Sequence, residues 1–278
     1  MDNISIQLAA QRLAPVQCNS WGHADTSGMQ TLDYYLSSGL MEPDDAAEHY
    51  TEHLIRLPNL SIYYEPIDIE PSAMSRTELG LRSDAVVFWC GQSLYKYLPQ
   101  FDQIFARIAQ LVQNCQFVFV KHPGAEQITA LFRRRLERAF AILGLKESNY
   151  CVLLPPLSQS KFIGAIGQCD IFLDSIGWSG CNTSLESLSH NLPIVTMQGS
   201  LMRGRHSAAI LRVMGITETI TNNVDEFVTT AARLANHPDE RYALRRKIAS
   251  NKHRLYRDRE CIEALEEFLD RTARKQAI

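Results

Sequence analysis

The chain has 278 residues, 45% of them hydrophobic and 21% charged, a composition typical of a globular protein with one large domain or two small ones. Its formal net charge of −3 gives no reason to expect nucleic acid or an anionic membrane surface as a partner. No apolar run approaches the ~20 residues that a membrane-spanning helix requires.

Seven cysteines are scattered along the chain without a CxxC pair, which argues against a disulfide framework and against a structural zinc site. The first residues show neither a basic region nor a cleavage-site pattern, so we expect no signal peptide. Together these observations predict a cytoplasmic protein.

The N-terminal segment, residues 1–66, is irregular and is interrupted by several glycines and prolines. Within it we predict a helix at 44–55, because acidic residues occupy its first turn. No complete set of βαβ units is visible there. We therefore interpret residues 1–66 as the remnant of another lobe, and residues 67–278 as a separate domain that ends in closing helices.

From residue 85 onward, short apolar runs alternate with longer helical patterns. The apolar runs are nearly continuous, as expected of parallel strands buried on both faces. We predict strands at 85–90, 116–120, 151–154, 170–173 and 193–197. We predict helices at 101–112, 128–143, 162–166, 184–190, 207–214, 224–235, 240–253 and 259–272. This alternation predicts the α/β class, with a doubly wound parallel sheet.

The loops that follow these strands matter most, because ligands of open α/β sheets bind beyond the carboxyl ends of the strands. The loop at 91–96 offers the polar side chains of Gln92 and Ser93 and the positive charge of Lys96. The alternative is a solvated loop with a surface lysine.

A second loop, residues 174–186, leads from a strand through two glycines into a helix. Helix N-termini attract phosphate, so Asn182 and Thr183 are expected to cap this helix and to bind a diphosphate at the same time. Glu186, one turn further on, is a candidate for binding ribose hydroxyls. Simple capping by Asn182 and Thr183, and a favourable interaction of Glu186 with the helix dipole, are the alternatives.

Three other loops are weaker candidates. Residues 198–206 contain Arg203, Arg205 and His206, which could meet phosphate, and residues 121–123 could line the same cleft. In the N-terminal segment, His23 lies in a polar, glycine-flanked loop and could act as an acid, a base or a sugar ligand. Each of these groups could equally be structural or solvated. The sequence has no DxD, HExxH or GxxxxGK[ST] motif, so we predict no metal site and no phosphate loop of the Walker type.

Taken together, these segments resemble the protein O-GlcNAc transferase and SPINDLY family of glycosyltransferases. The resemblance rests on RLAPVQ at 12–17, WGH at 21–23, TSG at 26–28, DYY at 33–35, LYK at 94–96, DIFLD at 170–174, GCNTSLE at 180–186 and LPIVT at 192–196. The order and spacing agree across residues 12–235.

This resemblance implies a Rossmann-like fold of the GT-B type and an inverting, metal-independent transfer of a sugar to Ser and Thr of proteins. The donor would be UDP-GlcNAc, or GDP-fucose as in SPINDLY, and no further cofactor is implied. It further implies that Lys96 neutralises the departing diphosphate and that Gly22 approaches the sugar. The resemblance also implies that Asn182 and Thr183 bind the phosphates and that Glu186 binds the ribose.

The chain also departs from the family pattern. A histidine expected to pack on the base is matched by Phe162, and a histidine before the Thr-Ser pair is matched by Cys181. Full members carry another Rossmann half, and usually helical repeats, before the segment at 12–17. We therefore expect a fragment or shortened form that binds nucleotide better than it transfers sugar, with a missing lobe or repeats as a possible partner.

The predicted site consists of two catalytic residues, Lys96 and His23, and of the nucleotide-sugar-binding residues Gly22, Gln92, Ser93, Phe162, Cys181, Asn182, Thr183, Glu186 and Arg205. The expected partners are a nucleotide sugar and a protein acceptor. The alternatives are a nucleotide-sugar-binding module with little transferase activity, a GDP-fucose-dependent protein O-fucosyltransferase, or a GT-B enzyme of another kind, such as an epimerase.

Overall fold

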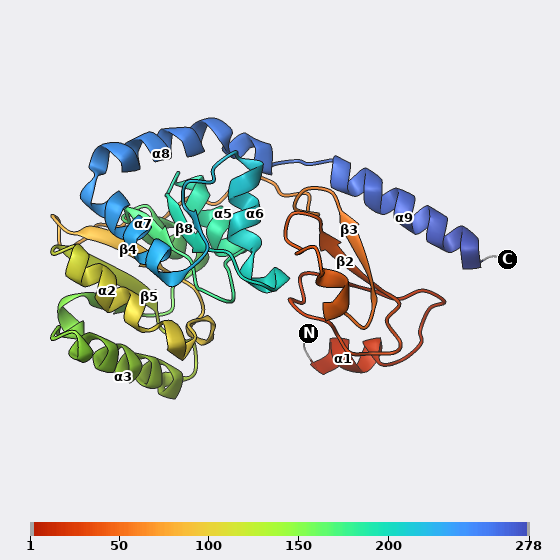
Figure 1. The fold of residues 1–278 in the computed structure, drawn as a ribbon, viewed down its shortest axis with the longest axis horizontal. Helices are drawn as coiled ribbons and strands as arrows, with labels where there is room; N and C mark the ends of the chain where they lie inside the picture. The colour runs from red at the N-terminus through yellow and green to blue at the C-terminus, as the bar shows by residue number, and fades with distance from the viewer. Residues whose placement is uncertain (1–2, 277–278) are drawn as a thin grey trace.

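The computed structural model describes residues 3–276 and shows two units of unequal size (Figure 1). The larger unit is built on a six-stranded sheet with the order β6-β5-β4-β7-β8-β9, in which every pairing is parallel. Its strands are β4 (Val86–Cys90), β5 (Cys115–Val120), β6 (Cys151–Leu154), β7 (Ile171–Leu173), β8 (Ile194–Met197) and β9 (Ile220–Thr221). The predicted parallel α/β sheet is confirmed, and β9 is an additional strand that the sequence analysis did not predict.

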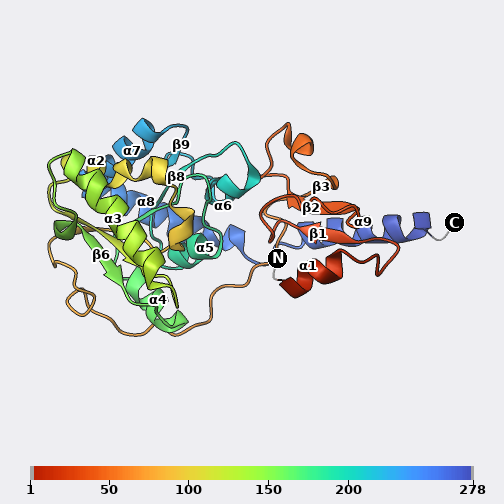
Figure 2. The ribbon, with the colours of Figure 1, turned by 90° about the horizontal axis from the view of Figure 1, so that it is seen from below.

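Seven α-helices of the larger unit cover this sheet: α2 (Gln103–Leu111), α3 (Glu126–Ile142), α4 (Gln159–Ile166), α5 (Asn182–Ser189), α6 (His206–Val213), α7 (Val224–Asn236) and α8 (Pro238–Asn251). Helix α2 contacts α3 and α7, whereas α4 contacts α5, and the two groups lie on opposite sides of the sheet (Figure 2). The sheet is therefore doubly wound, as predicted.

The centre of the sheet is filled with aromatic side chains. Phe88 and Trp89 of β4 and Phe117 and Phe119 of β5 are fully buried. Phe88 and Phe117 stack with ring centroids 5.1 Å apart. Because helices cover both faces, both faces of these strands are almost entirely apolar, which explains the nearly continuous apolar runs in the sequence.

The smaller unit contains three short parallel strands, β1 (Cys18–Ser20), β2 (Tyr34–Ser38) and β3 (His53–Leu57), with α1 (Asn3–Ala9) beside them. The predicted helix at 44–55 is wrong. Only a 3-10 turn forms at Ala46–His49, and β3 begins four residues later. The acidic residues at 44 and 45 suggested a helix start, but pairing with β2, which is distant in sequence, determines the extended conformation of β3.

The last helix, α9 (Glu260–Gln276), returns to the smaller unit (Figure 1). It contacts β3, and its Phe268 meets the Tyr34 ring of β2 edge-on at 5.1 Å. The sequence analysis assigned this helix to the domain 67–278, but by its packing it belongs with the three-stranded sheet. No helix within residues 3–276 is both long enough and apolar enough to cross a bilayer.

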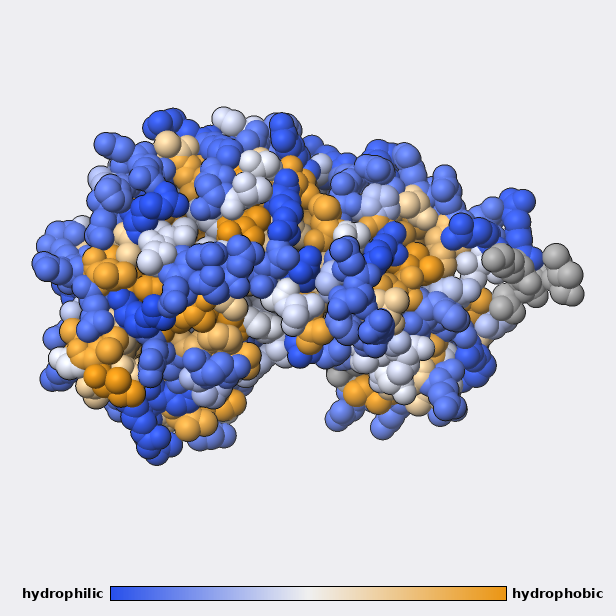
Figure 3. Space-filling view, viewed as in Figure 1, coloured by the Kyte–Doolittle hydropathy of each residue, from blue (hydrophilic) through white to orange (hydrophobic). Residues whose placement is uncertain are grey.

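Two chain segments connect the units and run side by side. The Tyr64 and Tyr256 rings stack with centroids 6.3 Å apart, the Arg257 backbone amide donates to the Tyr64 carbonyl at 2.9 Å, and Asn59 Nδ2 donates to Asp258 Oδ2 at 2.9 Å. An indentation separates the two units along one edge of the molecule (Figure 3). The paired connections hold the smaller unit beside the carboxyl edge of the large sheet.

Candidate functional site

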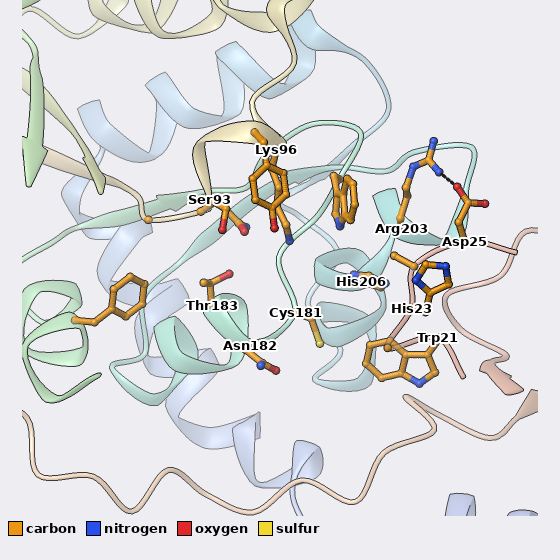
Figure 4. A pocket seen from close by; sticks show the side chains of 17 residues that line it. Trp21, His23, Asp25, Ser93, Lys96, Cys181, Asn182, Thr183, Arg203 and His206 are labelled. Atoms are coloured by element: carbon orange, nitrogen blue, oxygen red, sulfur yellow. Dashed lines mark hydrogen bonds and ion pairs between the residues drawn. The ribbon is translucent and has the colours of Figure 1, made fainter. Parts of the chain in front are cut away.

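The strand order places one cleft at the middle of the large sheet. Strands β4 and β7 are neighbours, but the chain leaves them toward opposite faces, so the loops that follow them separate. Such a switch point is where open α/β sheets bind ligands. A cleft of about 830 Å³ lies there. It is lined by residues 21–25 of the smaller unit and, in the larger unit, by Gly91, Gln92, Ser93, Tyr95, Lys96, Phe162, Trp178, Cys181, Asn182, Thr183, Arg203 and His206 (Figure 4).

Most of the predicted site residues line this single cleft. They are Gly22, His23, Gln92, Ser93, Lys96, Phe162, Cys181, Asn182 and Thr183. They come from regions up to 161 positions apart in the sequence (183 − 22). Glu186 and Arg205 are not among the lining residues.

Lys96 ends the 3-10 helix Leu94–Lys96, directly after β4. Its Nζ donates to the Ser179 carbonyl at 3.3 Å and lies 5.6 Å from the Trp178 ring centroid. Burial lowers the pKa of this ammonium group, and the charge of Asp174 opposes the change. Within residues 3–276 Lys96 forms no salt bridge. Its positive charge therefore faces the cleft without a carboxylate bound to it.

The start of α5 brings backbone amides to the same cleft. The expectation that Asn182 and Thr183 cap this helix is wrong, because Cys181 occupies the N-cap position and no side chain caps the helix. In the described part of the chain, the amides of Asn182 and Thr183 donate to no protein acceptor, and Thr183 Oγ1 is buried without a partner. An uncapped helix start that borders a cleft is suited to an anion.

Asp174 holds the loop between β7 and α5 in place. Its buried carboxylate accepts hydrogen bonds from Ser179 Oγ at 2.6 Å, the Gly180 amide at 2.7 Å, Thr196 Oγ1 at 2.7 Å and Gln92 Nε2 at 3.0 Å. Burial raises the pKa of Asp174, although these bonds favour its charged form. The sequence analysis recognised Asp174 only as part of a motif, since nothing in the sequence shows that four donors converge on it.

Gly180 is required where the loops from β4 and β7 meet. A Cβ at this position would overlap Gln92 Nε2 and would lie 2.6 Å from Ser184 Oγ and 2.7 Å from Thr183 Oγ1. Real Cβ atoms do not approach other heavy atoms so closely. The absence of a side chain therefore allows the two loops to meet in the cleft.

Glu186 and Arg205 have other surroundings. Glu186 lies half-buried in the second turn of α5, where burial raises its pKa to about 7, and its charge acts on the Tyr64 hydroxyl of the connecting segment. Arg205 donates to the Gly199 carbonyl at 3.2 Å, and the charges of Glu42, Asp44 and Asp45 act on it. Arg205 thus faces the smaller unit and not the cleft.

The smaller unit closes one side of the cleft. The Trp21 ring lies 5.4 Å from the His206 ring, and Asp25 forms an ion pair with Arg203 across the boundary between the units. His23 lines the cleft from this side, its carbonyl accepts a hydrogen bond from Tyr35, and burial lowers the pKa of its imidazole.

Sequence reasoning missed several aromatic residues of the cleft. Tyr95 and Trp178 meet edge-on with ring centroids 6.0 Å apart, and Lys96 lies over the Trp178 ring. A tryptophan in a glycine-rich loop after a strand was the available signal. A second hollow of about 300 Å³ adjoins the cleft at Phe162 and is also lined by Lys121 and His122. The cleft thus combines a cation, free amides and aromatic walls, which suits a ligand with a phosphate group and flat rings.

The chain is similar to known proteins in sequence and in fold. The sequence pattern of Glycosyl transferase family 41 matches residues 64–260. A probable UDP-N-acetylglucosamine–peptide N-acetylglucosaminyltransferase SPINDLY from Arabidopsis thaliana is 31% identical over 235 residues, which are 84% of this chain and 25% of the relative. A protein of the same description from Eustoma exaltatum subsp. russellianum is 29% identical with the same coverage. The chain thus spans about a quarter of the length of these relatives.

Among solved structures, an O-GlcNAc transferase mutant from Thermobaculum terrenum is similar to this chain with a TM-score of 0.78 and 24% sequence identity. The match covers 95% of this chain and 49% of the other. At this level of identity the likeness shows the fold, which is of the GT-B type expected from the sequence.

Proposed function

The chain belongs to Glycosyl transferase family 41, and from this premise we propose that it forms the donor-binding part of a glycosyltransferase that transfers a sugar to Ser and Thr hydroxyls of proteins. The observation that carries the proposal is the shared cleft of Lys96 and the uncapped start of α5. In this cleft they present an ammonium group and two free amides to one ligand.

We propose UDP-GlcNAc as the donor. The descriptions of the SPINDLY relatives name this sugar nucleotide and peptide acceptors, which supports the choice. The diphosphate lies between Lys96 and the amides of Asn182 and Thr183. The aromatic wall at Phe162 and the hollow beside it receive the base. Gly22 leaves room for the sugar on the side of the smaller unit. The donor is the substrate, and no other cofactor is proposed.

The proposed reaction inverts the anomeric centre. The acceptor oxygen forms a bond to the anomeric carbon as the bond from that carbon to the diphosphate oxygen breaks. The leaving diphosphate gains negative charge, which Lys96 and the α5 amides stabilise without a divalent metal ion. His23, which burial keeps neutral near pH 7, accepts the proton of the attacking hydroxyl.

Glu186 and Arg205 keep weaker roles in this proposal. Glu186 lies on α5, one turn beyond the amides that bind phosphate, and would reach the ribose only at the edge of the cleft. For Arg205, which donates to the Gly199 carbonyl and is acted on by the charges of Glu42, Asp44 and Asp45, we propose a role at the boundary with the smaller unit in place of the predicted phosphate contact.

Titration calorimetry of the full chain with UDP tests the proposal. We expect UDP to bind with the same affinity in EDTA and in magnesium. A strict requirement for magnesium contradicts the metal-independent mechanism, and a lack of binding to both UDP and GDP contradicts the site itself. Tighter binding of GDP than of UDP favours a GDP-fucose-dependent enzyme over the UDP-GlcNAc-dependent one.

A second candidate function is a nucleotide-sugar-binding module with little transfer activity. One observation favours it: the groups that would bind the nucleotide all come from the larger unit, whereas the smaller unit contributes only residues 21–25 to the cleft. Incubation with UDP-GlcNAc and a Ser/Thr peptide, followed by mass spectrometry, separates the two candidates. A modified peptide supports the transferase, and donor binding without modification supports the module.

A further inference from the structure

The loop at 121–123, with the sequence KHP, follows β5 and has no role in the proposed mechanism. The Lys121 backbone amide donates to the Leu154 carbonyl of β6 at 2.9 Å, and the His122 backbone amide donates to Thr129 Oγ1 of α3 at 3.2 Å. Both Lys121 and His122 line the second hollow, of about 300 Å³. Their backbone is thus tied to a strand and to a helix, which holds both side chains at the wall of this hollow.

The second hollow leads away from the proposed diphosphate site. Phe162 and residues 91–93 line both the cleft and the hollow, whereas Lys121 and His122 line only the hollow. A nucleotide whose diphosphate lies at Lys96 therefore passes its base beside Phe162. The edge of the base that is remote from the glycosidic bond then points toward Lys121 and His122.

One ring nitrogen of His122 is an open acceptor. Its Nδ1 lies 2.8 Å from the Pro123 carbonyl oxygen, which can only accept, so in the neutral ring Nδ1 carries the proton and Nε2 has the lone pair. Nε2 forms no hydrogen bond within residues 3–276, and it is not among the unpartnered polar atoms that are buried there. It is therefore accessible to an N–H group of a ligand in the hollow.

Lys121 offers a donor beside this acceptor, and within the described part of the chain it forms no salt bridge. A neighbouring donor and acceptor match a base edge at which a ring N–H stands beside a carbonyl oxygen. Uracil and guanine have such an edge. Cytosine and adenine have the reverse arrangement, an unprotonated ring nitrogen beside an amino group.

We infer that Lys121 and His122 select a keto base, uracil or guanine, in the donor nucleotide. His122 Nε2 accepts a hydrogen bond from the ring N–H, and Lys121 donates one to the adjacent carbonyl oxygen. The inference rests on the proposed function, which places the base in the second hollow. Cytosine or adenine would turn a lone pair toward His122 and an amino group toward Lys121, so that neither contact forms and binding is weaker.

Calorimetry of the full chain with UDP, CDP, GDP and ADP tests the inference. These ligands share the ribose and the diphosphate, and each keto base has an amino base of the same ring size as its counterpart. At pH 8 an ordinary imidazole is neutral. Under this condition UDP should bind about tenfold more tightly than CDP, or GDP about tenfold more tightly than ADP, as expected for one mismatched hydrogen bond.

Variants at the two positions show whether these side chains make the distinction. His122→Phe keeps a ring in the hollow but removes the acceptor, so it should bind the preferred diphosphate about tenfold more weakly and its amino-base counterpart with unchanged affinity. His122→Gln has an amide oxygen that can reach the Nε2 position and should recover most of the preference. Lys121→Met removes the donor and should narrow the preference in the same way as His122→Phe.

His253→Phe is the matched control. His253 Nδ1 makes the same kind of contact, to the Ser250 carbonyl oxygen at 2.9 Å, but the residue is exposed and lines neither the cleft nor the second hollow. This variant should bind all four diphosphates as the unchanged protein does.

Several outcomes overturn the inference. If the unchanged protein binds each keto base and its amino counterpart equally, the inference fails while the proposed function stands, because the diphosphate is then bound without selection of the base. An equal loss for both bases in His122→Phe assigns the residue to the shape of the hollow. Failure of His122→Gln to recover the preference excludes Nε2 as the acceptor. If none of the four diphosphates binds, the proposed function itself fails, and the inference fails with it.

Discussion

The ammonium group of Lys96 is partly buried, and within the described part of the chain it forms no salt bridge. A lysine in this state is destabilised by desolvation and is free to bind an anion, so it is expected to contribute more to nucleotide affinity than a surface lysine. The Trp178 ring under its ammonium group offsets part of the desolvation.

Replacing Lys96 by Ala should weaken UDP binding by about 1.5–3 kcal/mol, the usual contribution of a hydrogen bond to a charged group. Because burial lowers the pKa of Lys96, its positive charge is lost at a lower pH than that of an exposed lysine. UDP affinity should therefore also begin to fall at this lower pH. Calorimetry across an alkaline pH series measures both effects. Lys146→Ala, at an exposed position, is the control. Unchanged affinity in Lys96→Ala would remove the assigned role.

Glu186 makes stability depend on pH. A glutamate carboxyl ordinarily has a pKa of 4.5, and burial raises the pKa of Glu186 in the folded state to about 7. The folded state therefore binds the Glu186 proton more tightly than the unfolded state does. The stability that this tighter proton binding provides is fully present below about pH 4.5 and is lost as the pH rises through 7.

Glu186→Gln should therefore stabilise the protein at pH 8, by about 1 kcal/mol once screening of this partly exposed group is allowed for. At pH 4 it should have little effect. Denaturant unfolding at both pH values measures the difference, with the exposed Glu266→Gln as the control. The same stabilisation at both pH values would show that the carboxyl is not destabilised by burial.

At the scale of the elements, the site depends on two loops that meet without space for a side chain. The loop after β4 carries Gln92, and the loop after β7 carries Gly180 and leads into α5. Asp174 bonds to both, so the distance between Lys96 and the α5 amides is set by a buried hydrogen-bond network and not by either element alone.

Gly180→Ala should separate these loops. The added methyl group would meet Gln92, Ser184 and Thr183, and overpacking of this kind typically costs about 1–3 kcal/mol. UDP affinity should fall more than tenfold, on the order of the loss of one well-placed contact. Gly39→Ala is the control, because a Cβ there would lie at an ordinary 3.5 Å from the Leu57 carbonyl. Equal behaviour of the two variants in calorimetry and thermal unfolding would contradict the close approach.

At the scale of the whole molecule, the two ends of the chain build the smaller unit together. Strands β1–β3 come from the first 57 residues and α9 from the last, and Phe268 of α9 is 3% exposed against the small sheet. A three-stranded sheet is marginal without a helix to cover its apolar face, so we expect α9 to determine the stability of this unit.

Phe268→Ala should destabilise the smaller unit by about 3 kcal/mol through the cavity it leaves. Hydrogen exchange should accelerate in residues 34–57 and stay unchanged in residues 86–120, and UDP affinity should be nearly unaffected. Leu269→Ala, at a neighbouring side chain that is 48% exposed, is the control. Faster exchange throughout the large sheet would show that the two units unfold as one.

Much of the large unit could be predicted from the sequence because its signals are local. Five of its six strands are nearly continuous apolar runs, which are favoured because helices bury both faces of the sheet. Of the three basic residues predicted in the loop 198–206, Arg203 and His206 line the cleft and Arg205 does not. The sequence offers all three alike, because which side chain reaches the cleft depends on how the loop packs against the rest of the fold.

The sequence by itself determined the α/β class, the alternation of strands and helices, and the cluster of polar loops at the carboxyl ends of the strands. Periodicity and composition act over a few residues, and they are sufficient for these features. Only the tertiary structure decided that β1–β3 pair, that α9 returns to them, that Asp174 anchors both loops, and that His206 is buried beside Trp21. These features depend on contacts between distant parts of the chain, whose free energy appears only when the whole fold brings them together.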